Sequence, residues 1–232
     1  MHIPDGVLPV SVWMLGFFIM LLAIGISLFR LRNMDLRKKI PLLGAVSAAM
    51  LVAMSLEILP IAYHINLSVV AGILLGPALG FLAAFITNLI LALMGHGGIT
   101  VIGLNTLLLG SEAVIGHTLF YLFKQRLPVF WRAALATIIT LFMTTLALIG
   151  IVALSHIDPD LVRHVDEHKA VAAVQESIST FAIIVLSIGL IGWLIESAVT
   201  GAVVSFISQV KPDLLGHVLH REQSNRFSRS DR

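Results

Sequence analysis

The chain of 232 residues contains no cysteine and very little charge. Without cysteine there is no disulfide framework, no thiolate zinc site and no iron–sulfur cluster. Asp, Glu, Lys and Arg together make up 12% of the residues, whereas a soluble domain usually carries about 25%. This is too little charge to cover a globular surface, so a soluble cytoplasmic enzyme, a disordered tail and a disulfide-stapled secreted domain are all excluded.

Apolar residues are correspondingly abundant. They make up 58% of the chain, and the mean hydropathy is +0.98. The sequence pI near 9.2 does not indicate a nucleic-acid partner, because the formal net charge is only +2 and the basic residues lie between and after the apolar segments. The composition therefore predicts an integral membrane protein.

Apolar runs long enough to cross a bilayer as a helix, about 20 residues, recur along the chain. The clear ones are 11–30, 40–58, 100–123, 129–155 and 177–208. A further run, 65–94, is interrupted at Gly76-Pro77, and proline disfavours helix at the residue before it. Two helices, near 66–75 and 77–94, would bring the total to seven and give an all-α polytopic fold.

The basic residues decide whether the 65–94 segment crosses once or twice. All but Arg163 and Lys169 form three clusters, 30–39, 124–132 and 211–232. Cytoplasmic segments of membrane proteins carry an excess of Lys and Arg, and the three clusters share one side only if 65–94 crosses twice. The predicted topology has seven helices, the amino terminus outside and the carboxyl terminus inside. A single transmembrane domain spans 1–215, and a cytoplasmic tail spans 216–232.

The first two residues can chelate a metal ion. No cleavable signal peptide is visible, so the mature chain is expected to begin with the free amine of Met1, followed by His2. This amine, the amide nitrogen of His2 and its imidazole would occupy three corners of a square and leave the fourth open. Copper(II) and nickel(II) favour such a planar nitrogen site, whereas zinc prefers a tetrahedron. An initiator methionine followed by a chance histidine is the alternative for these two residues alone.

The fourth ligand should be an imidazole on the same side of the membrane. His64 follows the second helix, and His96 lies in the turn Gly95-His96-Gly97-Gly98; each alone could instead be a structural or solvated histidine. His117, inside a long helix, is interpreted as a packed and hydrogen-bonded residue. The polar segment 156–175 is predicted to be an outer loop, which could gather cations or simply be solvated.

Polar and small residues within the predicted helices have structural interpretations. Glu112 and Glu196 are expected to make hydrogen-bonded helix–helix contacts, because an unpartnered carboxylate in a membrane is costly. Asn88 and Asn105 could orient metal ligands, with Asn105 the stronger candidate. A ridge of small residues on the second helix is expected to pack tightly inside the bundle, with packing against a partner subunit as the alternative. It consists of Ala45, Ala49 and Ala53.

Four motifs in order cover nearly the whole chain. They are the opening Met1-His2-Ile3-Pro4-Asp5-Gly6, His64 with the downstream Leu74-Leu75-Gly76-Pro77, the glycine-rich turn with Asn105, and the closing Lys211-Pro212-Asp213-Leu214-Leu215. Together they resemble the membrane substrate-binding component of nickel and cobalt energy-coupling-factor transporters, the NikM/CbiM family. Where that family usually carries Asp in the turn, this chain has His96, which could bring a second imidazole to the site or lie at its entrance.

The resemblance implies a ligand set and a function. One Ni²⁺ or Co²⁺ would be bound by Met1, His2 and His64, with His96 and Asn105 around the site or at its entrance. The opening motif is closer to that of nickel members. The implied fold is a six-helix substrate subunit of the vitamin-transporter type with an extra amino-terminal helix.

The resemblance also implies partners and a location. The chain would capture the ion outside a prokaryotic cell membrane and deliver it inward. Its partners would be a transmembrane coupling subunit, cytoplasmic ATPase subunits and a small accessory membrane subunit. It would not be an enzyme and would need no organic cofactor.

Two other classes of protein are compared with this interpretation as a metal-binding transporter subunit. An intramembrane metalloprotease would need a His-Glu-x-x-His helix, which the sequence lacks. A self-standing metal-cation channel or secondary transporter would carry paired charges at mid-membrane and repeated halves. No internal repeat is visible, but this class stays the alternative. The sequence also has no Gly-x-x-x-x-Gly-Lys-Ser/Thr loop, so ATP hydrolysis would be the task of a partner.

Overall fold

The computed structural model describes residues 8–37, 39–56, 64–124, 126–155 and 167–215, with the side chains of the last range described from residue 178 onward. These residues form seven α-helices and one 3-10 helix and contain no strand, which confirms the predicted all-α fold. The elements are α1 (Val10–Leu31), α2 (Lys39–Ser55), α3 (Ser68–Leu75), α4 (Pro77–Leu93), α5 (Ile102–Leu122), α6 (Val129–Ser155), α8 (Glu167–Val210) and η1 (Pro212–Leu215).

The break between α3 and α4 lies where the sequence predicts it. Gly76 adopts a φ of +86°, which is unfavourable for residues with a side chain, and it separates the two helices. Pro77 then occupies the first position of α4, where its missing N–H costs no helical hydrogen bond.

The predicted loop over 156–175 is wrong in its second half, because α8 begins at Glu167. The next nine residues include three alanines, a lysine, a glutamine and a glutamate, all of which favour helix. His168 therefore lies in a helix, whereas His164 is outside the described residues.

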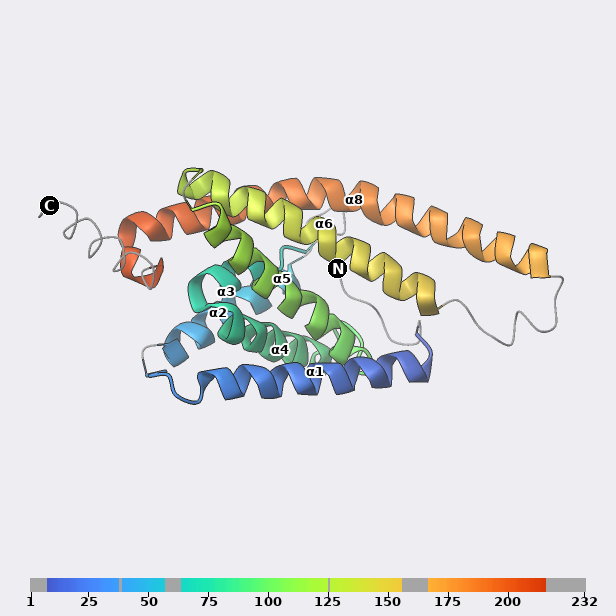
Figure 1. Ribbon diagram of the computed structural model, residues 1–232, viewed down its shortest axis with the longest axis horizontal. Coiled ribbons are helices and arrows are strands. Elements are labelled where there is room, and N and C mark those ends of the chain that lie inside the picture. Colours follow the sequence, from blue (N-terminus) through green and yellow to red (C-terminus); the bar gives the residue numbers. More distant parts are fainter. Residues whose placement is uncertain (1–7, 38, 57–63, 125, 156–166, 216–232) are drawn as a thin grey trace, which may run out of the picture.

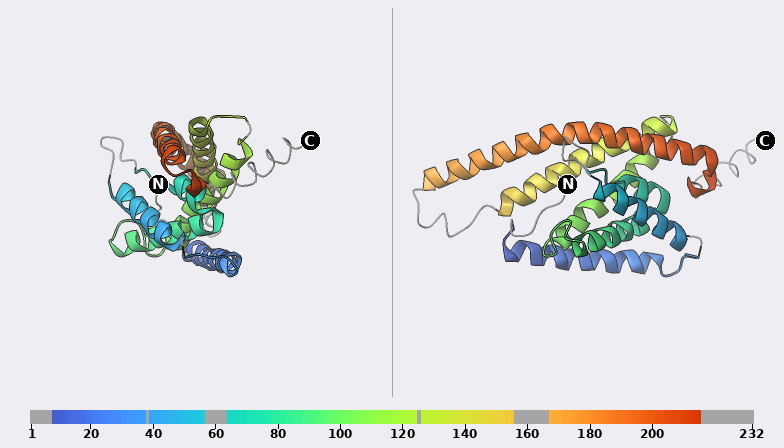
Figure 2. Two further views of the ribbon diagram at one scale, coloured as in Figure 1. Left: turned by 90° about the vertical axis from the view of Figure 1, so that its left-hand side faces the viewer. Right: turned by 180° about the vertical axis from the view of Figure 1, so that it is seen from behind.

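The helices are arranged around α5. α1 lies along one edge of the bundle and the antiparallel pair of α6 and α8 along the opposite edge, with α2 to α5 between them (Figure 1). The views from the end and from behind show the same arrangement (Figure 2). α5 contacts α1, α3, α4 and α6, so most elements are positioned through it.

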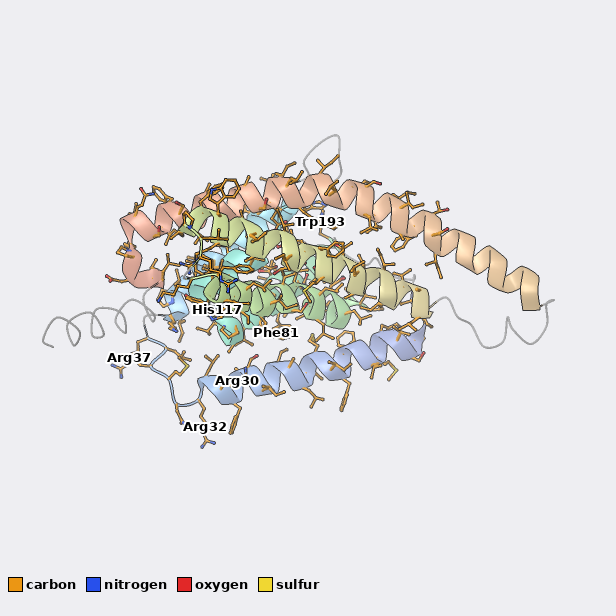
Figure 3. All side chains as sticks on the ribbon, turned by 45° about the horizontal axis from the view of Figure 1, so that its top comes forward. Arg30, Arg32, Arg37, Phe81, His117 and Trp193 are labelled. Atoms are coloured by element: carbon orange, nitrogen blue, oxygen red, sulfur yellow. The ribbon has the colours of Figure 1, made fainter. Side chains whose placement is uncertain are left out.

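Most basic residues in the described part of the chain gather at one end of this bundle. The loop after α1, the turn after α5 and the end of α8 lie together on the left of Figure 1. Figure 3 labels Arg30, Arg32 and Arg37 there. We call this the basic end, defined by Arg30, Arg32, Arg37, Lys39, Lys124, Arg126 and Lys211. The clustering agrees with the two-helix prediction for 65–94.

The helices differ in their ability to cross a membrane. Three segments are long and apolar enough by length and composition: Val10–Leu31, Val129–Ser155 and Ile178–Val210. α2 and α4 are shorter apolar helices. α3 has only 8 residues and rises about 12 Å, less than half of a bilayer core. It therefore begins inside the bundle and not at its surface.

Glycines allow α5 to touch two neighbours backbone to backbone. A Cβ added to Gly72 of α3 would overlap the carbonyl oxygen of Ala113 in α5. A Cβ added to Gly103 of α5 would lie 2.6 Å from the carbonyl carbon of Gly16 in α1. Larger residues would separate these helices, so the two glycine contacts fix the position of α5.

The small-residue ridge of α2 does not pack inside the bundle as expected. Ala45 and Ala49 are exposed and Ala53 is half-buried, whereas Met50 and Met54 point inward and are 0% and 1% exposed. The bulkier methionines fill the core, and the alanines form an outward-facing surface.

Candidate metal-binding site

The segment before α3 is anchored by two buried carboxyl groups. Asn66 is 3% exposed, and its Nδ2 donates to Oε2 of Glu112 at 2.7 Å. The N–H of Leu67 donates to Oε1 of Glu196 at 3.3 Å. The predicted hydrogen-bonded role of the two glutamates is confirmed, and the group they hold is the segment that carries His64.

These anchors place the segment at half the depth of the bundle. Glu112 is the central residue of α5, and its second oxygen accepts from Oγ1 of Thr144 in α6 at 3.0 Å. Trp193 of α8, labelled in Figure 3, lines the same internal cavity as Asn66 and Glu112. A buried carboxyl group is tolerable only with such partners. The chain therefore enters the bundle before α3 begins.

His96 is positioned by the turn that ends α4. Gly95 has a φ of +78°, and its N–H donates to the carbonyl of Ala92 at 3.0 Å. The N–H of His96 donates to the carbonyl of Leu91 at 2.8 Å. These two bonds with a left-handed glycine form a Schellman motif, which closes the helix and fixes the direction of the residue after the glycine. The predicted glycine-rich turn is confirmed.

The two anchored segments bring His64 and His96 together. Their ring centroids are 5.3 Å apart, and the ring planes are nearly perpendicular at 87°. Both side chains are half-buried. The sequence identified each histidine separately as a candidate, but it gave no indication that the two rings would touch.

A small recess lies behind His96. Asn88 of α4 and Asn105 of α5, 4% and 3% exposed, line it together with the glycines of the turn. Nδ2 of Asn88 has no hydrogen-bond partner among the described residues. Both asparagines thus lie next to the histidine pair, as a role in orienting ligands requires; that role stays a prediction.

His117 has the packed role that the sequence predicts. Its Nδ1 lies 2.9 Å from the carbonyl oxygen of Gly72, and its ring centroid is 4.5 Å from that of Tyr121. It lines an apolar groove of about 610 Å³ at the basic end, rimmed by Arg30 and Lys39. His117 therefore belongs to the opposite end of the bundle from the pair of histidines.

Met1 and His2 lie outside the described residues. Within the ranges that the structure describes, no three His, Asp or Glu side chains are close enough to hold an ion together. The described part of the site therefore supplies two imidazoles, and further donors would have to come from elsewhere in the chain.

The fold and this site define a helical membrane protein with imidazoles gathered inside one end of its bundle. A family model described as the cobalt uptake substrate-specific transmembrane region matches residues 2–214, and the chain belongs to this family.

Named relatives agree with this assignment, and a solved structure shows the same fold. A putative fused nickel transport protein NikMN of Archaeoglobus fulgidus is 31% identical over 229 residues, covering 93% of this chain and 68% of that protein. The cobalt transport protein CbiM of Clostridium tetani is 30% identical over 159 residues, covering 64% of this chain; the match spans 66% of that protein, just under two thirds. The crystal structure of a truncated transition metal transporter has the same fold, with a TM-score of 0.73 at 19% identity over 90% of this chain and 99% of that one.

Proposed function

We propose that the chain is the substrate-binding membrane subunit of an energy-coupling-factor importer. It captures Ni²⁺, or Co²⁺ as the second choice, from outside the cell and delivers it inward with ATP-driven partners. Family membership over residues 2–214 and the nickel and cobalt names of the relatives support this proposal.

The observation that carries the proposal is the anchoring of His64. A metal-binding imidazole needs a fixed orientation, and the groups that supply it matter nearly as much as the ligand itself. Here Asn66 and Leu67, two and three residues after His64, are bonded to Glu112 and Glu196. A histidine in a solvated loop has no need of a fixed backbone, whereas the backbone after His64 is held by two buried carboxyl groups.

The proposed donor set is the Met1 amine, the His2 amide nitrogen, the His2 imidazole and the His64 imidazole. Four nitrogens suit nickel(II) and cobalt(II), whereas magnesium and calcium prefer oxygen ligands. Binding strips water from the ion and holds it inside the bundle. Acid is expected to release the metal, because these nitrogens bind only when deprotonated.

The partners are proposed from two surfaces. The outward-facing Gly44, Ala45 and Ala49 on α2 allow another membrane helix to approach closely, which suits a coupling subunit. The basic end faces the cytoplasm in this proposal, on the side where ATPase subunits would act. ATP hydrolysis there would reorient the whole subunit.

The test compares nickel binding by two purified versions of the full chain. One has the native start, confirmed by mass spectrometry, and the other has one residue added before Met1. The extension removes the terminal amine from the chelate, so tight binding should be lost while the thermal unfolding of the apo protein stays unchanged. Equal binding in both versions would overturn the terminal-amine site. Nickel uptake into cells or vesicles without any ATPase partner would favour the self-standing channel or secondary transporter instead.

A further inference from the structure

The separation of the two imidazoles fits two ligands on one ion. With metal–nitrogen bonds of about 2 Å, the ring centroids of two imidazoles on one ion lie about 4.5–5.5 Å apart for N–metal–N angles between about 90° and 120°. The observed separation of His64 and His96 is 5.3 Å. The separation of the ring centroids therefore fits a shared ion.

Each ring reaches this position by its own anchor. The backbone near His64 is tied to α5 and α8 through Glu112 and Glu196. His96 follows the Schellman turn of α4, where Gly95 holds the left-handed conformation. Because neither anchor depends on the other ring, the two imidazoles are brought together by the fold itself. Such preorganisation lowers the cost of binding a ligand between them.

We propose that His96 is a direct metal ligand and that His64 and His96 bind one divalent transition-metal ion between them. This inference rests on the proposed function only for the remaining donors. If the Met1–His2 chelate and His64 fill a square plane, His96 supplies a fifth nitrogen from outside that plane. The site then favours a five-coordinate ion over a planar one.

The fifth donor has a spectroscopic consequence. A planar four-nitrogen nickel(II) ion has all its electrons paired and is diamagnetic, whereas a five-coordinate ion of the same donors is usually paramagnetic. Cobalt(II) accepts five ligands readily, so His96 would bring its affinity closer to that of nickel(II). Magnetism therefore distinguishes a ligand from a neighbouring ring that only packs against His64.

Two aromatic rings also favour perpendicular packing without a metal ion. Variants are therefore needed to distinguish a packing role of His96 from a role as a metal ligand. His96→Phe keeps a ring in the same place and removes both nitrogens. His96→Gln removes the ring. His64→Phe provides the matching change on the other side. A purely packing role predicts that His96→Phe behaves like the unchanged protein.

The experiment uses nickel(II) alone as the probe, with the full chain in detergent. Affinity is measured by calorimetry, and the magnetic moment by the shift of a reference signal in NMR. The native-start protein should bind paramagnetic nickel. In His96→Phe the bound nickel should become diamagnetic, and the affinity should fall about tenfold or more. Unchanged moment and affinity in His96→Phe would overturn the proposal.

The version with one residue before Met1 distinguishes this proposal from the proposed function. It should retain weak nickel binding that is lost on His64→Phe or His96→Phe, because the two imidazoles remain. If extension abolishes all binding and His96→Phe changes nothing, the histidine pair is refuted and the terminal chelate stands. If extension changes nothing and His96→Phe abolishes binding, the pair stands and the terminal chelate is refuted.

Discussion

The two ends of the bundle hold their polar groups in different ways. The histidine end is defined by His64, His96 and the Gly95–Gly98 turn. Hydrogen bonds to α5 and α8 fix the segment after His64, and backbone hydrogen bonds to α4 fix the turn. At the basic end, Arg30, Arg32 and Arg37 are exposed, and Arg30 and Lys39 rim an apolar groove.

In the proposed function the two ends have different tasks. Binding a metal ion requires donors within a fraction of an ångström of their places, and buried hydrogen bonds supply that accuracy. Orienting a protein in a membrane requires only net positive charge on one side. Substitutions should therefore be costly around the histidines and mild around the arginines.

The largest effect is expected from Gly72→Ala, which would break the backbone contact between α3 and α5 in the core. The new methyl group would overlap the backbone of α5 at Ala113. We expect a loss of about 3 kcal/mol in the free energy of unfolding, measured by thermal or denaturant unfolding in detergent. Gly150→Ala in α6 is the control, because nothing lies within 4 Å of its added Cβ. Equal stability of the two variants would show that α3 and α5 are not in backbone contact.

The second effect concerns the anchor of His64. Glu112→Ala removes the acceptor of both Asn66 and Thr144. We expect nickel affinity to fall by about 10- to 100-fold, as for the loss of other groups that orient metal ligands. Glu112→Gln is the matched variant, because its amide oxygen can still accept from Asn66 and its NH₂ can donate to Thr144, and its loss should be smaller. Calorimetry measures the nickel affinity of both variants. An unchanged affinity in Glu112→Ala would show that the hydrogen bonds of Glu112 are not needed for metal binding.

A third effect concerns the outward face of α2 and leaves the isolated subunit intact. Ala49→Leu adds bulk to an exposed position, so the free energy of unfolding should change by less than about 0.5 kcal/mol. Nickel affinity should not change either. Co-purification with the coupling subunit should be lost, because a leucine would keep the partner helix at a distance. Retained assembly would place the coupling subunit on a different surface.

The mildest substitutions test which end faces outward. The chain has no cysteine, so single cysteines can be labelled without background. Ile99→Cys in the turn of the histidine end and Arg32→Cys at the basic end both replace exposed side chains. In intact cells a membrane-impermeant thiol reagent should modify Ile99→Cys, and Arg32→Cys only after permeabilisation. The reverse pattern would invert the proposed topology.

Much of the fold could be predicted because it depends on local sequence. Apolar runs gave the helices, and Gly76-Pro77 marked the break between α3 and α4 to within two residues. The start of α8 was missed because its first residues are polar, and hydropathy alone does not report helix propensity. The alanine ridge was assigned to the interior because small residues suit both an internal and an external interface.

The site could be predicted only in its parts. His64, His96 and Asn105 were identified as separate candidates from motifs, and Met1 and His2, outside the described residues, stay a prediction. The pairing of the two rings could not be predicted, because it depends on how Glu112 and Glu196, far along the chain, hold Asn66 and Leu67. Hydrogen bonds between distant helices leave no spacing pattern in the sequence.

The glycine contacts of α5 bear on how such a subunit could release its ion. A helix that touches its neighbours backbone to backbone, as α5 does at Gly72 and at Gly16, cannot slide along them without first coming apart. Piston-like movement of α3 or α1 past α5 is therefore blocked. The distance between the two histidines should stay constant through a transport cycle, and the ion should change sides by tilting of the bundle as one body.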